Sequence, residues 1–234
     1  MSYPAQDLVC PDPAGCPVLD SLPRLRTYQL PAETPMFRVY DSTWGYDEHN
    51  PGYGDARFSP FDDPADGRRV PSMYLAATAT AALLETIFHE VHHRGSRTIF
   101  ERDLRHHLLA HLRVPTPARL GDLRDVELAR HQIDRDQVVS SPAEHYPCTR
   151  RLAVAAYAAS RSRPFAGLIW NSRQAELAEG STTEVVVLFG TRYPSGRGTW
   201  TRTGPGSSNL VEGPGRLLVE SIAEELDATI EPDG

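Results

Sequence analysis

Residues Tyr53–Glu85 read Y-G-D-A-R-F-S-P-F-D-D-P-A-D-G-R-R-V-P-S-M-Y-L-A-A-T-A-T-A-A-L-L-E, and they predict three elements in succession. A glycine-containing loop delivers Arg57, and a short apolar segment around Tyr74 predicts a strand. An alanine- and leucine-rich helix follows, with Thr78 as its expected N-cap and Glu85 one turn or more inside it. This loop, strand and helix hold the most informative side chains of the chain.

Glu85 is the strongest candidate for a functional residue. It falls on a helix face whose other members are apolar: Ala81, Leu84 and Phe88. Burying a carboxylate there is costly unless a partner compensates it, and Arg57 and Tyr74 are the nearest candidates for that partner. Perturbed carboxylates mark functional sites more often than chance, whereas a structural Glu–Arg pair is an equally weighted alternative.

The remaining apolar patterns predict a chain in which strands and helices alternate. The predicted strands are Met36–Asp41, Met73–Ala77, Gly167–Asn171 and Glu184–Phe189, and the predicted helices are Leu123–Arg130, Thr149–Ser160 and Leu217–Leu226. The periodicity of His107–Val114 fits a strand or a helix. We expect loops over Thr43–Asp55 and Ser195–Gly215, and an irregular arm over residues 1–35 that packs on the domain.

Composition places the chain among ordinary globular proteins. Its 234 residues are 40% apolar and 24% charged, with a net charge of -7 that gives no reason to expect direct nucleic-acid binding. All 24 basic residues are arginine, for which codon usage is a simpler explanation than phosphate binding. The three cysteines, Cys10, Cys16 and Cys148, have no zinc or disulfide spacing. Without a signal-peptide pattern or a membrane-spanning run, the expected location is the cytoplasm.

Four further side chains are candidates for ligand binding, and each has a structural alternative. Arg38 in F-R-V-Y and Arg57 could hold phosphates, or they could be ordinary surface arginines. Tyr74 could stack on a planar ring, or it could be a core residue. Ser172, directly after G-L-I-W-N, could hydrogen-bond a ligand at the end of a strand, with strand capping as the alternative. Thr149 is a second hydroxyl candidate, and its alternative is plain helix capping.

The segment His89–His93 reads H-E-V-H-H and matches the H-E-x-x-H zinc signature. On a helix it would present His89 and His93 to a metal, with Glu90 as a base. The extended metzincin motif fails, however, because Ser96 and Ile99 stand where glycine and histidine are required. An exposed, histidine-rich helix end before Gly95 explains the pattern better than a zinc site does, so no metal is expected. A zinc metallohydrolase that uses His89, Glu90 and His93 is the less favoured alternative.

The order Arg57, Tyr74, Glu85 and Ser172 resembles the RES domain, a family named for arginine, glutamate and serine. The resemblance extends from F-R-V-Y near Phe37 to V-V-V-L-F-G-T-R near Arg192. It implies three parts: an N-terminal extension over 1–35, a RES catalytic domain over 36–194, and a loop with a closing helix over 195–234. It also implies an α/β fold of the mixed α+β, ADP-ribosyltransferase-like kind, with a split β-sheet and surrounding helices, and it favours a strand for His107–Val114.

The same resemblance implies that the substrate is NAD⁺ and that the chain is the toxin of a RES–Xre toxin–antitoxin pair. The implied activity is cleavage of the nicotinamide–ribose bond with phosphate or water as acceptor, and protein ADP-ribosylation is the alternative within the fold. A non-catalytic binding module is a further alternative. The implied catalytic residues are Glu85 and Arg57, and Arg38, Arg57, Tyr74 and Ser172 would bind NAD⁺. The implied protein partner is an Xre-type helix-turn-helix antitoxin; the sequence leaves homo-oligomerisation open.

Overall fold

The segments Gly167–Asn171 and Glu184–Phe189 form the adjacent central strands β9 and β10 of the computed structural model, within the predicted bounds. The structure describes residue 11 and residues 24–89, 91, 97–159 and 163–232. Strand β10 is buried on both faces: Val185 and Val187 belong to one hydrophobic cluster, and Val186 and Leu188 belong to the other. Burial on both faces explains why this strand is an uninterrupted apolar run rather than an alternating one.

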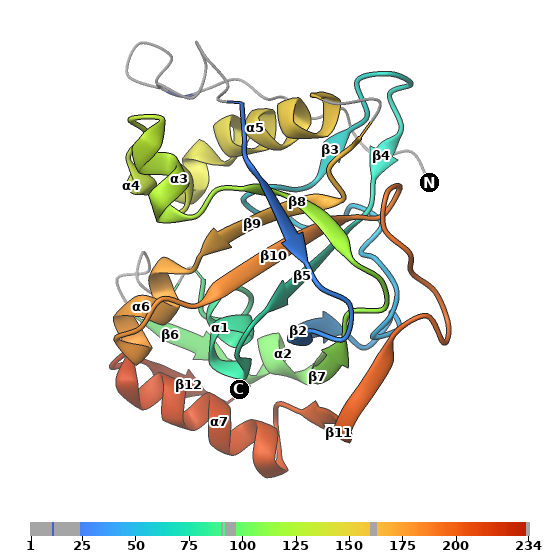
Figure 1. Cartoon of the computed structure of the whole chain (residues 1–234). Coiled ribbons are helices and arrows are strands. Elements are labelled where there is room, and N and C mark those ends of the chain that lie inside the picture. The colour runs from blue at the N-terminus through green and yellow to red at the C-terminus, as the bar shows by residue number, and fades with distance from the viewer. Residues whose placement is uncertain (1–10, 12–23, 90, 92–96, 160–162, 233–234) are drawn as a thin grey trace.

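These strands belong to a mixed sheet with eight strands among the described residues (Figure 1). In spatial order they are β1 (Thr27–Leu30), β8 (Ala118–Asp122), β9, β10, β5 (Ser72–Ala76), β2 (Pro35–Asp41), β7 (His107–Arg113) and β11 (Thr201–Asn209). Strands β8 and β9 are parallel, and the other neighbouring strands are antiparallel. Strands β2 and β5 are joined through the single pair Phe37–Ala76, so the sheet is split there. The predicted mixed α/β fold with a split sheet is confirmed.

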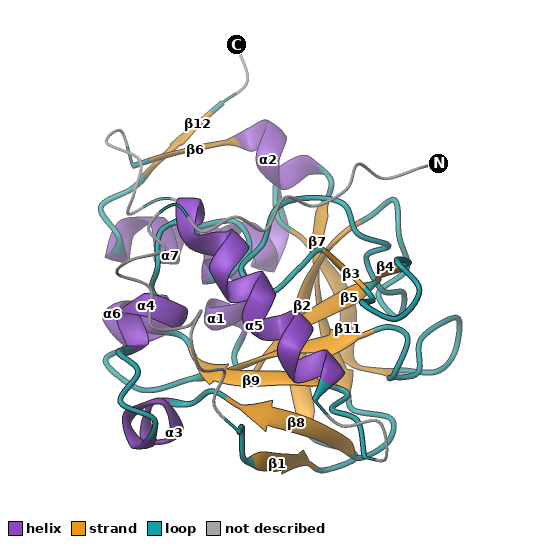
Figure 2. Ribbon diagram, turned by 90° about the horizontal axis from the view of Figure 1, so that it is seen from above, coloured by secondary structure: helices purple, strands orange, loops and turns teal. Residues whose placement is uncertain are grey.

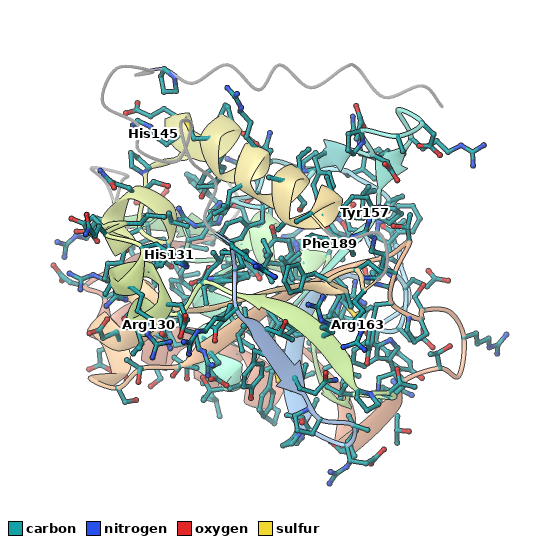
Figure 3. The ribbon with its side chains drawn as sticks, turned by 45° about the horizontal axis from the view of Figure 1, so that its top comes forward. Arg130, His131, His145, Tyr157, Arg163 and Phe189 are labelled. Atoms are coloured by element: carbon teal, nitrogen blue, oxygen red, sulfur yellow. The ribbon has the colours of Figure 1, made fainter. Side chains whose placement is uncertain are left out.

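Helices cover one face of the sheet. They are α1 (Ala79–Leu84), α2 (Glu101–Arg105), α3 (Asp125–Arg130), α4 (Arg135–Val138), the 3-10 turn η1 (Ala143–His145), α5 (Tyr146–Ala158), α6 (Arg173–Glu179) and α7 (Gly213–Glu225). Figure 2 shows α1, α5 and α7 on the same side of the strands. Near the end of α5, Tyr157 packs edge-on against Phe189 of β10, with ring centroids 5.5 Å apart (Figure 3). Two small sheets complete the fold: β3 (Phe61–Asp62) with β4 (Arg69–Val70), and β6 (Thr98–Phe100) with β12 (Thr229–Glu231).

The prediction of a loop over Ser195–Gly215 is wrong. Residues Thr201–Asn209 form the edge strand β11, which pairs with β7 and contains a register shift between Arg202 and Ser207. The partner strand supplies hydrogen bonds that the glycine- and serine-rich composition does not predict, because strand formation depends on tertiary context more than on intrinsic propensity. Helix α7 also begins earlier than predicted, at Gly213.

The prediction of an irregular arm over residues 1–35 is wrong for Thr27–Leu30. These residues form β1, which pairs with β8 at the opposite edge of the sheet. The strand and helix predictions inside the domain are confirmed: His107–Arg113 is a strand, and Asp125–Arg130, Tyr146–Ala158 and Gly213–Glu225 are helices.

The helix that leads to Glu85 is shorter than predicted. Thr78 caps it as expected by accepting a hydrogen bond from the backbone N–H of Ala81, but α1 ends at Leu84 and Glu85 is its C-cap residue. His89 therefore lies in a turn and not on a helix. The short helix places the Glu85 carboxylate at the end of the element, beside the loops that complete the site.

Candidate active site

Arg38, Arg57, Tyr74 and Glu85 line one cavity of about 420 Å³. This size lies within the range of about 300–1,000 Å³ that is usual for small-molecule sites. Strand β2 supplies Arg38, β5 supplies Tyr74, and the end of α1 supplies Glu85. Four residues that were predicted separately thus meet at a single hollow near the split in the sheet.

The Glu85 carboxylate is held in place by Ser172. The Ser172 hydroxyl donates a hydrogen bond of 2.6 Å to Glu85 Oε1. Burial raises the pKa of Glu85, while the positive charge of Arg57, this hydrogen bond and His89 act in the opposite direction. Burial therefore disfavours the charged form of Glu85, and these three neighbours offset part of that effect.

Ser172 supports the site from behind and does not line the cavity. It is fully buried at the junction of β9 and α6, where its hydroxyl also accepts the backbone N–H of Ala175 at 3.1 Å as the N-cap of α6. The expected partners of Glu85 were Arg57 and Tyr74, but its hydrogen bond comes from Ser172. Because a single hydroxyl caps a helix and orients the carboxylate, the geometry makes Ser172 a positioning residue.

Arg57 is anchored to the segment that precedes α5. Its Nη1 donates to the carbonyls of Val138 at 3.1 Å and Ser141 at 2.9 Å, and to the Ser141 hydroxyl at 2.7 Å. The guanidinium also lies over the ring of Tyr146, 5.1 Å from its centroid. Within the described part of the chain, Nε and Nη2 of Arg57 have no hydrogen-bond partner, so one edge of the guanidinium is available to a ligand anion.

Tyr74 braces the Arg57 loop and also faces the cavity. Its hydroxyl accepts hydrogen bonds from the backbone N–H of Phe58 at 3.1 Å and from the Ser59 hydroxyl at 3.2 Å. Burial raises the pKa of Tyr74 to about 12, so the hydroxyl is neutral at physiological pH. A hydroxyl that accepts two hydrogen bonds still has its own proton to donate, and the structured part of the chain offers no acceptor for it.

Arg38 is a buried arginine, not a surface one. Its Nη1 donates to the carbonyls of Gly45 at 3.3 Å and Tyr46 at 2.5 Å, and thereby holds the loop after β2. Burial lowers the pKa of Arg38 to about 10, which still leaves it charged at neutral pH. Together with Arg57, it brings positive charge to the lining of the cavity.

A family profile described as RES domain matches residues 31–199 of this chain. The chain belongs to the RES domain family. The matched residues include Arg57, Glu85 and Ser172, the arginine, glutamate and serine on which the resemblance rests. They come from a loop, a helix end and a strand end, and the fold brings them to one site.

Structural comparison adds a relative of the same fold. The crystal structure of the M. tuberculosis MbcT-MbcA toxin-antitoxin complex contains a chain that superposes with a TM-score of 0.50 and 16% sequence identity. The match covers 83% of this RES-domain chain and 92% of the other chain. No curated protein matches the sequence.

Thr149 does not supply a hydroxyl to the cavity of this RES domain. The alternative, that it caps its helix, is also wrong, because α5 begins at Tyr146 and its N-cap residue is His145. The fully buried Thr149 hydroxyl hydrogen-bonds the backbone carbonyl of Arg57 and, at 3.1 Å, that of Tyr146. Thr149 therefore ties α5 to the Arg57 loop.

Of the three residues in the zinc hypothesis, Glu90 and His93 lie outside the residues that the structure describes, and His89 lies inside them. His89 lines the cavity near Glu85, and its Nδ1 lies 2.8 Å from the carbonyl of Thr86. Among the residues that the structure describes, no group of three His, Cys, Asp or Glu side chains could hold a metal ion. In the same residues, no helix is long and apolar enough to cross a membrane.

Several residues of the site gave no signal in the sequence. Ser141 and Tyr146 contact Arg57, and the buried Arg150 donates to the carbonyl of Ala56 at 3.1 Å and pairs with Asp55. Their partners are more than 80 positions away in the chain, so no local motif connects them. Tyr53 also lines the cavity, and its place between two glycines is the one hint that the sequence offered.

Proposed function

We propose that this RES-domain chain is the toxin of a bacterial toxin–antitoxin pair and that it degrades NAD⁺. The observation that carries the proposal is the buried carboxylate of Glu85, which lines the same cavity as Arg38, Arg57 and Tyr74. A buried carboxylate and two arginines in one cavity suit a substrate that carries a pyrophosphate and develops a cation on its ribose. Membership of the RES family and the toxin–antitoxin complex of the structural relative support the same proposal.

The reaction would break the bond between nicotinamide and the ribose carbon C1″. The bonding electron pair leaves with nicotinamide, which departs as a neutral base and therefore needs no strong acid. The ribose develops oxocarbenium character, as in glycoside hydrolysis. Glu85 would accept a hydrogen bond from a ribose hydroxyl and place its negative charge beside the forming cation. Ser172 would keep that carboxylate oriented and charged.

The two arginines would hold the phosphates. Arg57 has an unoccupied edge for a bidentate contact with the pyrophosphate or with an incoming phosphate, and Arg38 lines the same cavity. With phosphate as acceptor, one of its oxygens forms the new bond to C1″ and the product is ADP-ribose-1″-phosphate. With water the product is ADP-ribose, and with a protein side chain it is an ADP-ribosylated protein. Tyr74 would contact nicotinamide through its ring or hydroxyl.

The proposed protein partner is an Xre-type helix-turn-helix antitoxin. Its DNA-binding domain, rather than this chain with its net charge of -7, would contact the operator. We expect the pair to act in the cytoplasm, where NAD⁺ is available. A helix-turn-helix gene next to the gene for this chain would agree with the proposal.

The direct test is incubation of the purified protein with NAD⁺, with and without phosphate, followed by chromatography of the products. We expect release of free nicotinamide. The phosphate dependence and the second product identify the acceptor. Absence of nicotinamide after prolonged incubation with phosphate, water and candidate protein acceptors would contradict the proposal.

Two variants test the division of roles. Glu85→Gln keeps the shape of the side chain but removes its charge, so kcat should fall by about 10²–10³-fold with little change in NAD⁺ binding. Arg57→Ala should instead weaken NAD⁺ binding, because the phosphate contact exists before the transition state. Wild-type turnover in Glu85→Gln, or a lowered melting temperature as its sole defect, would refute the assignment of Glu85.

A further inference from the structure

Two aromatic rings lie together on the wall of the active-site cavity, away from the hydrophobic core. Trp44 and Tyr53 stack with ring centroids 6.0 Å apart and an angle of 26° between their planes. The Tyr53 side chain is 46% exposed. Val126 and Leu217 are the other large apolar side chains that are exposed in the described ranges, and neither lines the cavity. An exposed ring beside a substrate cavity offers a stacking surface to a ligand.

The turn that presents Tyr53 is fixed before any ligand binds. The Asn50 side chain accepts the backbone N–H of Tyr53 at 2.8 Å and donates to the carbonyl of Tyr53 at 3.0 Å. The Asn50 backbone is bonded in both directions to Ser72 of β5, at 2.8 and 2.9 Å. Gly52 and Gly54 have φ of 120° and 83°, which other residues rarely adopt, and they place Tyr53 at the tip of the turn.

The turn that presents Trp44 is anchored to the neighbouring strand β2. The backbone N–H of Trp44 bonds to the carbonyl of Asp41 at 3.0 Å, and Arg38 holds the next two carbonyls, those of Gly45 and Tyr46. Both rings are therefore positioned by strands that also carry active-site residues. Rings fixed in advance lose little conformational entropy when a ligand stacks on them.

The geometry defines the class of group that fits. A planar ring between Trp44 and Tyr53 would need about 7 Å between parallel planes, since stacked atoms lie about 3.5 Å apart. The observed 6.0 Å between tilted rings excludes insertion, so a ligand ring would stack on the outward side of the pair. The same cavity offers Arg38 and Arg57 to phosphates and Glu85 to a ribosyl cation. In an adenine dinucleotide, the purine base is the part to which none of these contacts is assigned.

We propose that Tyr53, supported by Trp44, is the purine subsite of this cavity and stacks on the adenine ring. The inference rests on the proposed function for the identity of the whole substrate. It adds a separate contact that selects adenine dinucleotides over substrates without a purine. Stacking of a base on an aromatic side chain corresponds to a change of about 5- to 100-fold in affinity when the ring is removed.

The test is a titration of the protein with adenosine monophosphate, in which binding is measured by calorimetry and by quenching of tryptophan fluorescence. Tyr53→Ala should weaken binding by about 5- to 100-fold, and Tyr53→Phe should retain it because the ring is kept. Leu217→Ala removes a similarly exposed side chain on α7, far from the cavity lining, and should bind like the wild type. In a parallel titration, nicotinamide binding should be unchanged by Tyr53→Ala.

The outcomes separate this inference from the proposed function. If the wild type binds adenosine monophosphate through Tyr53 but does not consume NAD⁺, the proposed function fails and the subsite stands. If it consumes NAD⁺ and Tyr53→Ala binds adenosine monophosphate like the wild type, the subsite is refuted. Failure of the wild type to bind adenosine monophosphate would also refute the subsite. So would a Tyr53→Ala variant that loses affinity for nicotinamide and keeps its affinity for adenosine monophosphate. If the aromatic pair contacts a protein partner and not a base, Tyr53→Ala should bind adenosine monophosphate like the wild type.

Discussion

Glu85 and Ser172 are 87 positions apart, and their hydrogen bond favours the charged form of the carboxylate. Burial alone favours the protonated acid, and the pKa of Glu85 is raised. The Ser172 hydroxyl, the Arg57 guanidinium and His89 each favour the carboxylate. A raised pKa also means that the folded state holds a proton that the unfolded chain has lost. The free energy of unfolding therefore decreases as the pH rises from the unfolded-state pKa through the folded-state pKa.

Replacing Ser172 by alanine should change the pH dependence of activity as well as stability. The substitution removes a hydrogen bond that favours the carboxylate, so the pKa of Glu85 should rise further. If the charged form is active, the acid limb of kcat/KM moves to higher pH. Losing the N-cap of α6 should also lower the free energy of unfolding by about 1 kcal/mol.

A pH–rate profile and denaturant unfolding measure the two effects separately. Ser172→Thr is the matched control, since a threonine hydroxyl can cap α6 and donate to Glu85. An acid limb in Ser172→Ala that coincides with that of the wild type would mean that Ser172 only caps the helix.

At the scale of elements, α5 positions the arginine loop without contributing a conventional active-site motif. Thr149 in its first turns bonds the carbonyl of Arg57, and Arg150 bonds the carbonyl of Ala56. Burial lowers the pKa of Arg150 to about 10, and the pair with Asp55 offsets part of the cost of burying its charge. The segment before α5 bonds the guanidinium of Arg57 itself. Helix α5 and the segment before it thus fix the backbone and the side chain of Arg57.

Thr149→Val should therefore weaken the binding of NAD⁺. Valine has the shape of threonine but leaves the buried carbonyl of Arg57 without its donor, which costs about 1–3 kcal/mol of stability. Because Arg57 is proposed to hold phosphates, KM for NAD⁺ should rise by more than kcat falls. Steady-state kinetics check the split, and Thr149→Ser, which keeps the hydroxyl, should restore both parameters. Equal losses in Thr149→Val and Thr149→Ser would indicate a packing effect.

At the scale of the whole molecule, the C-terminal region completes the core. Strand β11 covers the edge of β7, and α7 contributes Val219, Ile222 and Ala223 to the cluster that also contains α1. The RES match ends at residue 199, before both elements. The site at the end of α1 therefore depends on residues beyond the matched region.

A chain truncated after residue 199 should fail to fold cooperatively. It would expose the edge of β7 and the apolar surface under α7, which favours aggregation. A chain ending at residue 227 is the control, because it loses β12 and keeps β11 and α7, and it should remain folded. Circular dichroism, solubility and thermal unfolding compare the two. Cooperative unfolding of the 1–199 chain would contradict this account of the C-terminal region.

Amino-acid patterns were sufficient to predict the elements whose burial is independent of a particular partner. The apolar runs of β9 and β10 gave their bounds directly, because a strand buried on both faces shows a continuous apolar pattern. The hydroxyl of Thr78 and the alanine-rich composition before Glu85 predicted the start of α1. The unusual position of an acid among apolar residues singled out Glu85, since its cost can be judged from local pattern alone.

Which elements and side chains meet follows from the packing of the folded chain. Strand β11 exists because β7 supplies hydrogen bonds to a segment of weak strand propensity, and β1 is a short segment that pairs with β8 at the other edge of the sheet. Ser172 reaches Glu85, and α5 reaches Arg57, through contacts between segments that are more than 80 positions apart. Residue patterns report local conformation and burial, whereas a long-range contact depends on the packing of the whole chain, which no local pattern encodes.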